Sequence, residues 1–144
     1  MQYHFDHSLG RITQQISRAL GKRFEQKSRE KGIHMRPDQW SVLSLLYHKG
    51  PQSHNAICDL LFMDKVSVSR TIERMGKKGL VTHEVDEKDK RMRIVSLTET
   101  GRKAYGELSH LAEITIDEAL KDMTTDETGQ LFDSLEKIKK NLGC

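Results

Sequence analysis

The sequence predicts a mainly α-helical fold with a small antiparallel β-hairpin, and two observations predict it. Residues 64–79 have the apolar spacing of an amphipathic helix. Residues 80–97 contain two β-prone segments on either side of a charged tip. A second short helix precedes the first of these elements, so the order matches a helix-turn-helix followed by a β-wing, which is a winged helix-turn-helix.

The helix expected over residues 64–79 has clear ends and a clear buried face. Val68, Ile72 and Met75 recur at spacings of four and three, which places them on one side of a helix. Asp64 is a good N-cap, because its carboxylate can accept free amide hydrogens of the first turn, and Gly79 is a good left-handed stop. The other faces carry cations and hydroxyls, which suit phosphates and base edges: Lys65, Ser67, Ser69, Arg70, Arg74 and Lys77.

The helix before it is short. Gly50-Pro51 breaks the chain, Ser53 can cap a new helix, and Phe62-Met63 forms a tight turn towards Asp64. The buried face of this short helix comprises Ala56, Ile57, Leu60 and Leu61. After the second helix, residues 80–85 and 92–97 form the strands of the wing, and the polar segment 86–91 forms its tip.

Long helices are expected on both sides of this lobe. Apolar residues recur at helical spacing from Phe5 to Phe24, so a helix over residues 5–30 would be roughly 39 Å long. A second long helix follows a Thr98 cap, and a third follows the break at 124–126. The lobe offers little surface to cover them all, so we expect a two-fold homodimer. The chain then forms one domain, 1–144, with dimerisation helices in 1–35 and 107–144 and a DNA-binding lobe in 36–106.

Composition agrees with a single small domain. The chain has 144 residues, of which 31% are charged, and contains no apolar run of membrane-spanning length. The first residues lack the apolar core of a signal peptide, so a cytoplasmic location is expected. Two cysteines, Cys58 and Cys144, cannot form a disulfide framework, which fits a reducing compartment.

The charge is unevenly distributed. Residues 1–63 carry 9 basic and 5 acidic groups, residues 64–106 carry 11 and 7, and residues 107–144 carry 4 and 9, giving +4, +4 and −5 and the total of +3. Positive charge therefore accompanies the helix and wing, whereas the C-terminal segment is acidic. This distribution predicts that the C-terminal segment faces away from phosphate.

Several motifs resemble the MarR family of bacterial transcriptional regulators. The wing carries Asp89-x-Arg91 followed by Val95-x-Leu97-Thr98-x-x-Gly101. Further matching segments occur in the same order: Asp38-Gln39-Trp40-x-Val42-Leu43, Gly50-Pro51, Asp64-Lys65, Val68-Ser69-Arg70, Arg74 and Lys77-Lys78-Gly79-Leu80-Val81. The chain departs from the family pattern at Val66, where Ser or Thr is common, and at Lys90, where Pro or Arg is common. These positions bear on the operator sequence, not on the fold.

The resemblance implies a sequence-specific regulator of double-stranded DNA, expected to be a repressor. In this interpretation Ser67, Ser69 and Arg70 contact base edges, Arg74 and Lys77 contact phosphate, and Lys65 belongs to the same DNA-binding face. Arg91 enters the minor groove and Asp89 holds it in place. Two recognition helices related by a two-fold axis would then read a pseudo-palindrome whose half-sites are roughly 34 Å apart.

The resemblance also implies a pocket for a small aromatic or phenolic effector between the dimerisation helices and the lobe. The residues expected near it are Ile12, Ile16, Met35, Trp40 and His110. For any one of them ordinary packing is the better interpretation, because apolar residues at helical spacing usually form core.

Other functions have weaker support. A redox switch through Cys58 is an alternative, although no activating base is close in sequence. His4 and His7 are one helical turn apart, but a zinc site needs three or four ligands, so we expect neither a metal nor another cofactor. The chain has no Gly-rich phosphate loop, nucleophile elbow or H-E-x-x-H motif, so no enzyme is expected. A winged helix that binds a protein instead of DNA is the remaining alternative.

Overall fold

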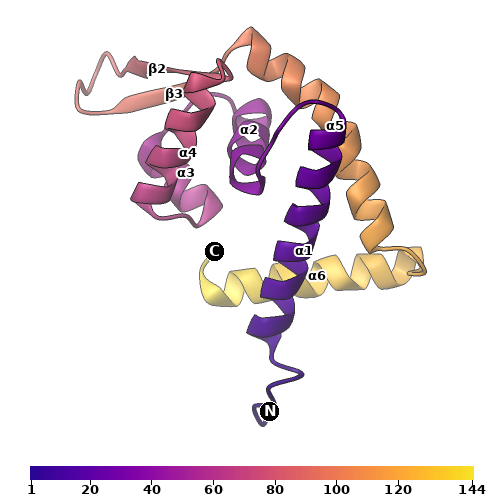
Figure 1. Cartoon of the computed structure of the whole chain (residues 1–144). Helices are drawn as coiled ribbons and strands as arrows, with labels where there is room; N and C mark the ends of the chain where they lie inside the picture. Colours follow the sequence, from indigo (N-terminus) through magenta and orange to yellow (C-terminus); the bar gives the residue numbers. More distant parts are fainter.

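The computed structural model describes residues 1–144 and has six helices with a three-stranded sheet (Figure 1). The elements in chain order are α1 (Leu9–Glu30), α2 (Pro37–Lys49), β1 (Gln52–Ser53), α3 (His54–Leu61), α4 (Lys65–Lys77), β2 (Val81–Val85), β3 (Arg93–Leu97), α5 (Glu99–Ala119) and α6 (Thr125–Leu142). The predicted class, mainly α with a small antiparallel wing, is confirmed.

The hydrophobic core lies in the middle of the chain and is centred on α2. Val42, Leu43 and Leu46 of α2 are buried, and the predicted apolar face of α4 packs in the same core. Of the face predicted for α3, Ile57 is buried and Leu61 packs against the core, whereas Leu60 is 51% exposed, so its predicted burial is wrong. Val95 of β3 and Leu108 of α5 complete it and are also fully buried. The helix-turn-helix and the wing are therefore held as one packed lobe.

The sheet is antiparallel with the strand order β1-β3-β2. Val81 pairs with Leu97 and Val85 with Arg93 along the wing hairpin, and Gln52 of β1 pairs with Val95 on the other edge of β3. The sequence analysis did not predict β1, because two residues after a proline carry no period-two pattern. This short strand ties the start of the helix-turn-helix to the wing.

Thr98 and Gly101 explain the end of the wing motif. Thr98 Oγ1 accepts the Gly101 amide hydrogen at 3.0 Å, which caps α5, and the same hydroxyl donates to the Gly79 carbonyl oxygen at 2.5 Å. A Cβ at position 101 would lie 2.2 Å from the Leu80 carbonyl oxygen. Only glycine fits here, because α5 starts directly against the backbone that links α4 to the wing.

The N-terminal helix is shorter than predicted. We expected it to start at Phe5, whereas α1 starts at Leu9, because Ser8 is the N-cap and its hydroxyl accepts the Arg11 amide hydrogen at 3.5 Å. Phe5 lies outside the helix, and the Arg11 guanidinium lies 4.4 Å from the centre of its ring. Apolar residues continue at helical spacing beyond the N-terminus of α1, because periodicity alone does not show where a helix is capped.

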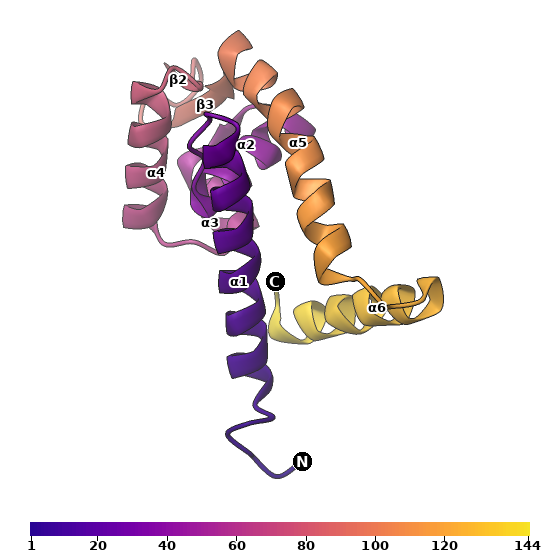
Figure 2. The ribbon, with the colours of Figure 1, turned by 45° about the vertical axis from the view of Figure 1, so that its right-hand side comes forward.

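The outer helices differ from the lobe. The C-terminal halves of α1 and α5 are joined by Glu118, which contacts Lys27 Nζ at 2.6 Å and Arg23 Nη1 at 3.3 Å. In contrast, α6 has no buried residue and exposes Leu131, Phe132 and Leu142. Figure 2 shows α6 beyond the far end of α5, away from α3 and α4. Its apolar side chains therefore have no core to join within this chain.

Candidate nucleic-acid interface

Helix α4 is fixed at both ends and along one face. The Asp64 carboxylate accepts the Ser67 amide hydrogen at 2.8 Å, and Gly79 has a positive φ of 71° after the helix ends. Val68, Ile72 and Met75 are fully buried, as the sequence predicted. Thr71 is buried beside them and donates its hydroxyl hydrogen to Asp38 Oδ2 at 2.7 Å, which links α4 to the start of α2.

The opposite side of α4 is exposed and basic. Lys65, Ser69, Arg70, Arg74 and Lys77 are all exposed, whereas Ser67 is half-buried. The Ser67 hydroxyl donates to Asp64 Oδ2 at 2.6 Å, so its hydrogen is already used inside the protein. These hydrogen bonds from Ser67 lower the pKa of Asp64, which keeps the cap ionised. Ser67 can still accept a hydrogen bond, but its ability to donate one to a base edge is reduced.

A cleft between α4 and the start of α2 brings in a cation that the sequence analysis missed. Its walls are Arg36, Pro37, Asp38, Met63, Ser67, Arg70, Thr71 and Arg74. Three of these residues are arginines, and the cleft includes the first turn of α2, where amide groups lack helical partners. Arg36 precedes a proline at the first position of a helix, and this local pattern could have drawn attention to it.

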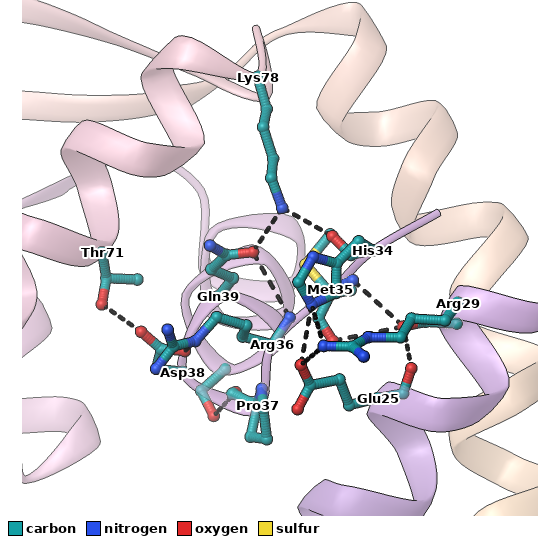
Figure 3. Close-up of polar contacts among 12 residues, drawn as sticks. Glu25, Arg29, His34, Met35, Arg36, Pro37, Asp38, Gln39, Thr71 and Lys78 are labelled. Carbon is teal, nitrogen blue, oxygen red and sulfur yellow. Dashed lines mark hydrogen bonds and ion pairs between the residues drawn. The ribbon is translucent and has the colours of Figure 1, made fainter. Parts of the chain in front are cut away.

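Two adjacent lysines at the end of α4 have different environments. Lys77 is exposed and lies 3.3 Å from Glu73 Oε1 in an ordinary surface pair. Lys78 donates from Nζ to the His34 carbonyl oxygen at 2.6 Å and to Gln39 Oε1 at 2.9 Å. Figure 3 shows the Lys78 side chain extending towards the start of α2. Burial lowers the pKa of Lys78, and nearby Asp38 partly opposes that effect.

The wing projects on the same side of the molecule as α4, at the left of Figure 1, away from α5 and α6. Its tip is ordered by Asp86, whose Oδ1 accepts the amide hydrogens of Lys88 and Asp89 at 2.7 and 3.2 Å. Asp89 Oδ1 accepts the Arg91 amide hydrogen at 3.0 Å and lies 3.8 Å from Arg91 Nε. The Arg91 side chain is 97% exposed, so it extends freely from a fixed backbone.

A histidine pair joins the wing to α3. His54 Nε2 and His83 Nε2 are 3.2 Å apart and their rings are stacked. Burial, then the neighbouring His83 and Arg93, lower the pKa of His54. The lowered pKa favours the neutral form of the His54 ring, whose Nε2 can donate to or accept from His83 according to its tautomer.

The five residues named for an effector pocket do not share one environment in the single chain. Met35 is only 1% exposed and belongs to the core, whereas Ile12 and Ile16 are exposed on α1, and His110 is exposed on α5 beside Glu113. Trp40 is half-buried and packs between Phe24 and Tyr105, with ring centres 5.0 and 5.3 Å away. Their role as a pocket stays a prediction.

The two cysteines form no disulfide, and the histidines form no metal-binding cluster. Cys58 is half-buried against the core, and Cys144 is exposed; both are free thiols. No group of three or more His, Cys, Asp or Glu side chains is placed to hold a metal ion. None of the helices is both long and apolar enough to cross a membrane.

This combination of helix-turn-helix, exposed basic α4 and ordered wing defines a winged-helix protein of the DNA-binding class. The MarR family model matches residues 33–92, from the turn before α2 to the far side of the wing tip. The chain is also 30% identical over 138 residues to the helix-turn-helix-type transcriptional regulator YwoH of Bacillus subtilis, covering 96% of this chain and 97% of YwoH. The chain belongs to the MarR family of transcriptional regulators and is not an enzyme.

Solved structures agree over nearly the whole chain. A probable transcriptional regulator from Pseudomonas aeruginosa is 28% identical, has a TM-score of 0.81 and is matched over 94% of this chain and 99% of its own. Bordetella bronchiseptica BpsR, whose DNA binding is regulated by 6-hydroxynicotinic acid, is 23% identical, with a TM-score of 0.84 and coverage of 96% and 98%. At that identity, BpsR shows the shared fold alone.

Proposed function

We propose that this protein is a homodimeric repressor that binds a pseudo-palindromic DNA operator through α4 and the wing. The observation that carries the proposal is the agreement between two separate elements. The exposed side of α4 is basic, and the wing projects on the same side of the lobe. The wing carries Arg91, whose side chain is 97% exposed. A helix in the major groove and an arginine in the adjacent minor groove need this arrangement.

Individual roles follow from the environments of the side chains. Ser69 and Arg70 are exposed in the first two turns of α4 and are the best groups for base edges, with Ser67 as an acceptor. Arg74, Lys77 and Lys65 suit phosphates. Arg36 and the first turn of α2 extend this phosphate-binding surface, because they share a cleft with Arg70 and Arg74.

The dimer is supported by apolar surface that the single chain leaves exposed. Leu9, Ile12 and Ile16 on α1 are exposed, and so are Leu131, Phe132 and Leu142 on α6. Exposed apolar side chains gathered on a helix favour an interaction site, and a second copy presents the same helices. The acidic C-terminal segment then lies in the dimer interface, away from DNA.

We further propose that a small molecule releases the protein from its operator. The support is that the structurally similar BpsR has its DNA binding regulated by 6-hydroxynicotinic acid. Because Ile12, Ile16 and His110 are exposed in one chain, a pocket that includes them would be completed by the partner's helices. Screening phenolic and aromatic acids for loss of DNA binding tests this release.

The DNA proposal is tested with Arg91→Ala. Duplexes selected from a random pool by the parent protein provide the probe, and fluorescence anisotropy measures affinity. We expect Arg91→Ala to weaken binding by about 1 to 3 kcal/mol without changing the mass of the free protein, because a guanidinium leaves the minor groove and no apolar contact is lost. Lys77→Ala should instead reduce the dependence of affinity on salt by about one counterion.

Lys139→Ala is the charge-matched control, since this lysine pairs with Glu136 on α6, outside the proposed DNA surface. Sedimentation of this variant checks that it has the same mass as the parent, because α6 belongs to the proposed dimer interface. Equal affinities of Arg91→Ala and the parent at several salt concentrations would show that the wing is misassigned.

A further inference from the structure

The two lysines at the end of α4 differ in their partners, because the ammonium group of Lys78 is hydrogen-bonded within its own chain. Lys77 and Lys78 are adjacent in the sequence and carry the same charge, so the sequence alone does not tell them apart. Both residues are exposed, but Lys77 pairs with Glu73, whereas the Lys78 ammonium donates to one carbonyl oxygen and one buried side chain of the same chain. Two of its three hydrogens are thus already used, so Lys78 is poorly suited to bind a phosphate.

The two acceptors of Lys78 lie where α1 turns into α2. The His34 carbonyl oxygen belongs to the turn before α2, and Gln39 Oε1 belongs to the first turn of α2, whose side chain is 1% exposed. Gln39 Oε1 also accepts the Arg36 amide hydrogen at 3.4 Å. Lys78 therefore holds the last turn of α4 against this junction, as Thr71 and Asp38 hold its middle.

A second set of contacts holds the same junction to α1, and Figure 3 shows those of Glu25, Arg29 and His34. His34 Nε2 lies 2.8 Å from Glu25 Oε1, and Arg29 Nη2 lies 3.2 Å from that oxygen. Ser28 is fully buried and its Oγ accepts the Met35 amide hydrogen at 3.1 Å. Hydrogen bonding from His34 lowers the pKa of Glu25, which keeps this carboxylate ionised.

We propose that Lys78 is a positioning residue that couples the orientation of α4 to α1 through His34 and Glu25, and that it is not a DNA contact. This inference rests on the proposed function of α4 as the recognition helix. A shift of α1 changes the position of Glu25 and His34, and the Lys78 contact to the His34 carbonyl transmits that shift to α4. Lys78 thereby gives the dimerisation helices a direct physical connection to DNA affinity.

The first test compares Lys78→Met with Lys77→Met on duplexes selected by the parent, across a series of salt concentrations. Lys77→Met should reduce the salt dependence by about one counterion. Lys78→Met should weaken binding by roughly tenfold at every salt concentration, with the parent's salt dependence. Circular dichroism confirms that both variants remain folded at the assay temperature.

A double-mutant cycle separates positioning from a purely structural role. Glu25→Gln should weaken DNA binding by roughly threefold in the parent and have no further effect in Lys78→Met, because the connection is already broken. Glu30→Gln is the matched control, since it removes the same charge from α1 but Glu30 contacts only Gln26. It should leave affinity close to that of the parent.

The outcomes distinguish this inference from the proposed function. If the parent selects no duplex, the DNA-binding proposal fails and Lys78 positions no recognition helix. If the parent binds and Lys78→Met reduces the salt dependence as Lys77→Met does, Lys78 is a phosphate contact and the inference is wrong. Additive effects of Glu25→Gln and Lys78→Met would also overturn it.

Discussion

Helices α4 and α6 are both amphipathic, yet only α4 finds a partner within its own chain. Val68, Ile72 and Met75 of α4 are fully buried, whereas Phe132 is 51% exposed and Leu142 is 72% exposed on α6. An apolar stripe on a helix predicts burial but does not say against which chain. The difference divides the molecule into a lobe with its own core and outer helices with exposed apolar faces, which we propose pair with a second copy.

In the proposed function, the same division separates the part that binds DNA from the part that regulates the binding. The lobe carries the basic side of α4 and the wing, and its core around α2 contains no residue of α6. The outer helices carry the acidic segment and exposed apolar residues such as Phe132 and Leu142. Communication between the two parts has to pass through α1 and α5, which extend from the lobe to the outer region.

The largest effect that the comparison predicts is on folding. Ile72→Ala in α4 should lower the free energy of unfolding by about 2 to 5 kcal/mol, because a fully buried side chain leaves a cavity. Leu131→Ala in α6 should cost far less at protein concentrations below self-association. Urea denaturation of both variants in dilute solution measures the contrast. Equal losses would mean that α6 is packed within its own chain.

The next effect is on self-association. Phe132→Asp should weaken the dimer by roughly 30-fold or more, because a carboxylate replaces an apolar group in the proposed interface. The lobe should keep its secondary structure. Sedimentation equilibrium over a concentration series measures the change, and Asp133→Asn on the adjacent position of α6 serves as a control for altered charge. A Phe132→Asp protein that remains dimeric would remove α6 from the interface.

Two glycines of α5 test how closely the start of this helix packs against the lobe. Gly101→Ala should destabilise the fold by about 1 to 3 kcal/mol, because the new Cβ meets the Leu80 carbonyl oxygen. Gly106→Ala, five residues further along α5, has nothing within 4 Å of its Cβ and should stabilise the helix by about 0.5 to 1 kcal/mol. Thermal unfolding compares them. Similar effects at both positions would contradict the close approach at Gly101.

The smallest effect concerns pH and the junction between α3 and the wing. Because the pKa of His54 is lowered, the unfolded chain binds a proton below the ordinary value of about 6.5 while the folded chain does not. Stability should therefore fall as the pH drops below about 6.5 towards the folded pKa. His54→Gln should reduce this fall between pH 7.5 and 5.5, and His110→Gln should not. Urea midpoints measure both, and an unchanged pH profile in His54→Gln would refute the assignment.

The sequence was enough to predict the elements whose cause is local. Caps at Asp64, Ser53 and Thr98 are visible because the capping residue adjoins its helix. The start of α1 was wrong by four residues, since Phe5 continues the apolar period after Ser8 has already ended the helix. Strand β1 was missed because its pairing with β3 is a tertiary contact.

The site was less predictable, because long-range contacts decide what each side chain is free to do. Exposure of Arg70 and Arg74 followed from helix periodicity. Arg36 joins them only through the packing of α2 on α4. The hydrogen bonds of Lys78 to His34 and Gln39 were likewise not predictable, because both partners are distant in the sequence.

The most direct test of the central claim is sedimentation equilibrium of the full chain, alone and with a duplex selected from a random pool. The account predicts twice the 16.6 kDa mass of one chain for the free protein at micromolar concentration. It also predicts two chains on each selected duplex, with inverted half-sites about 10 base pairs apart. A free protein of 16.6 kDa that binds a single, unrepeated half-site as one chain would contradict the account.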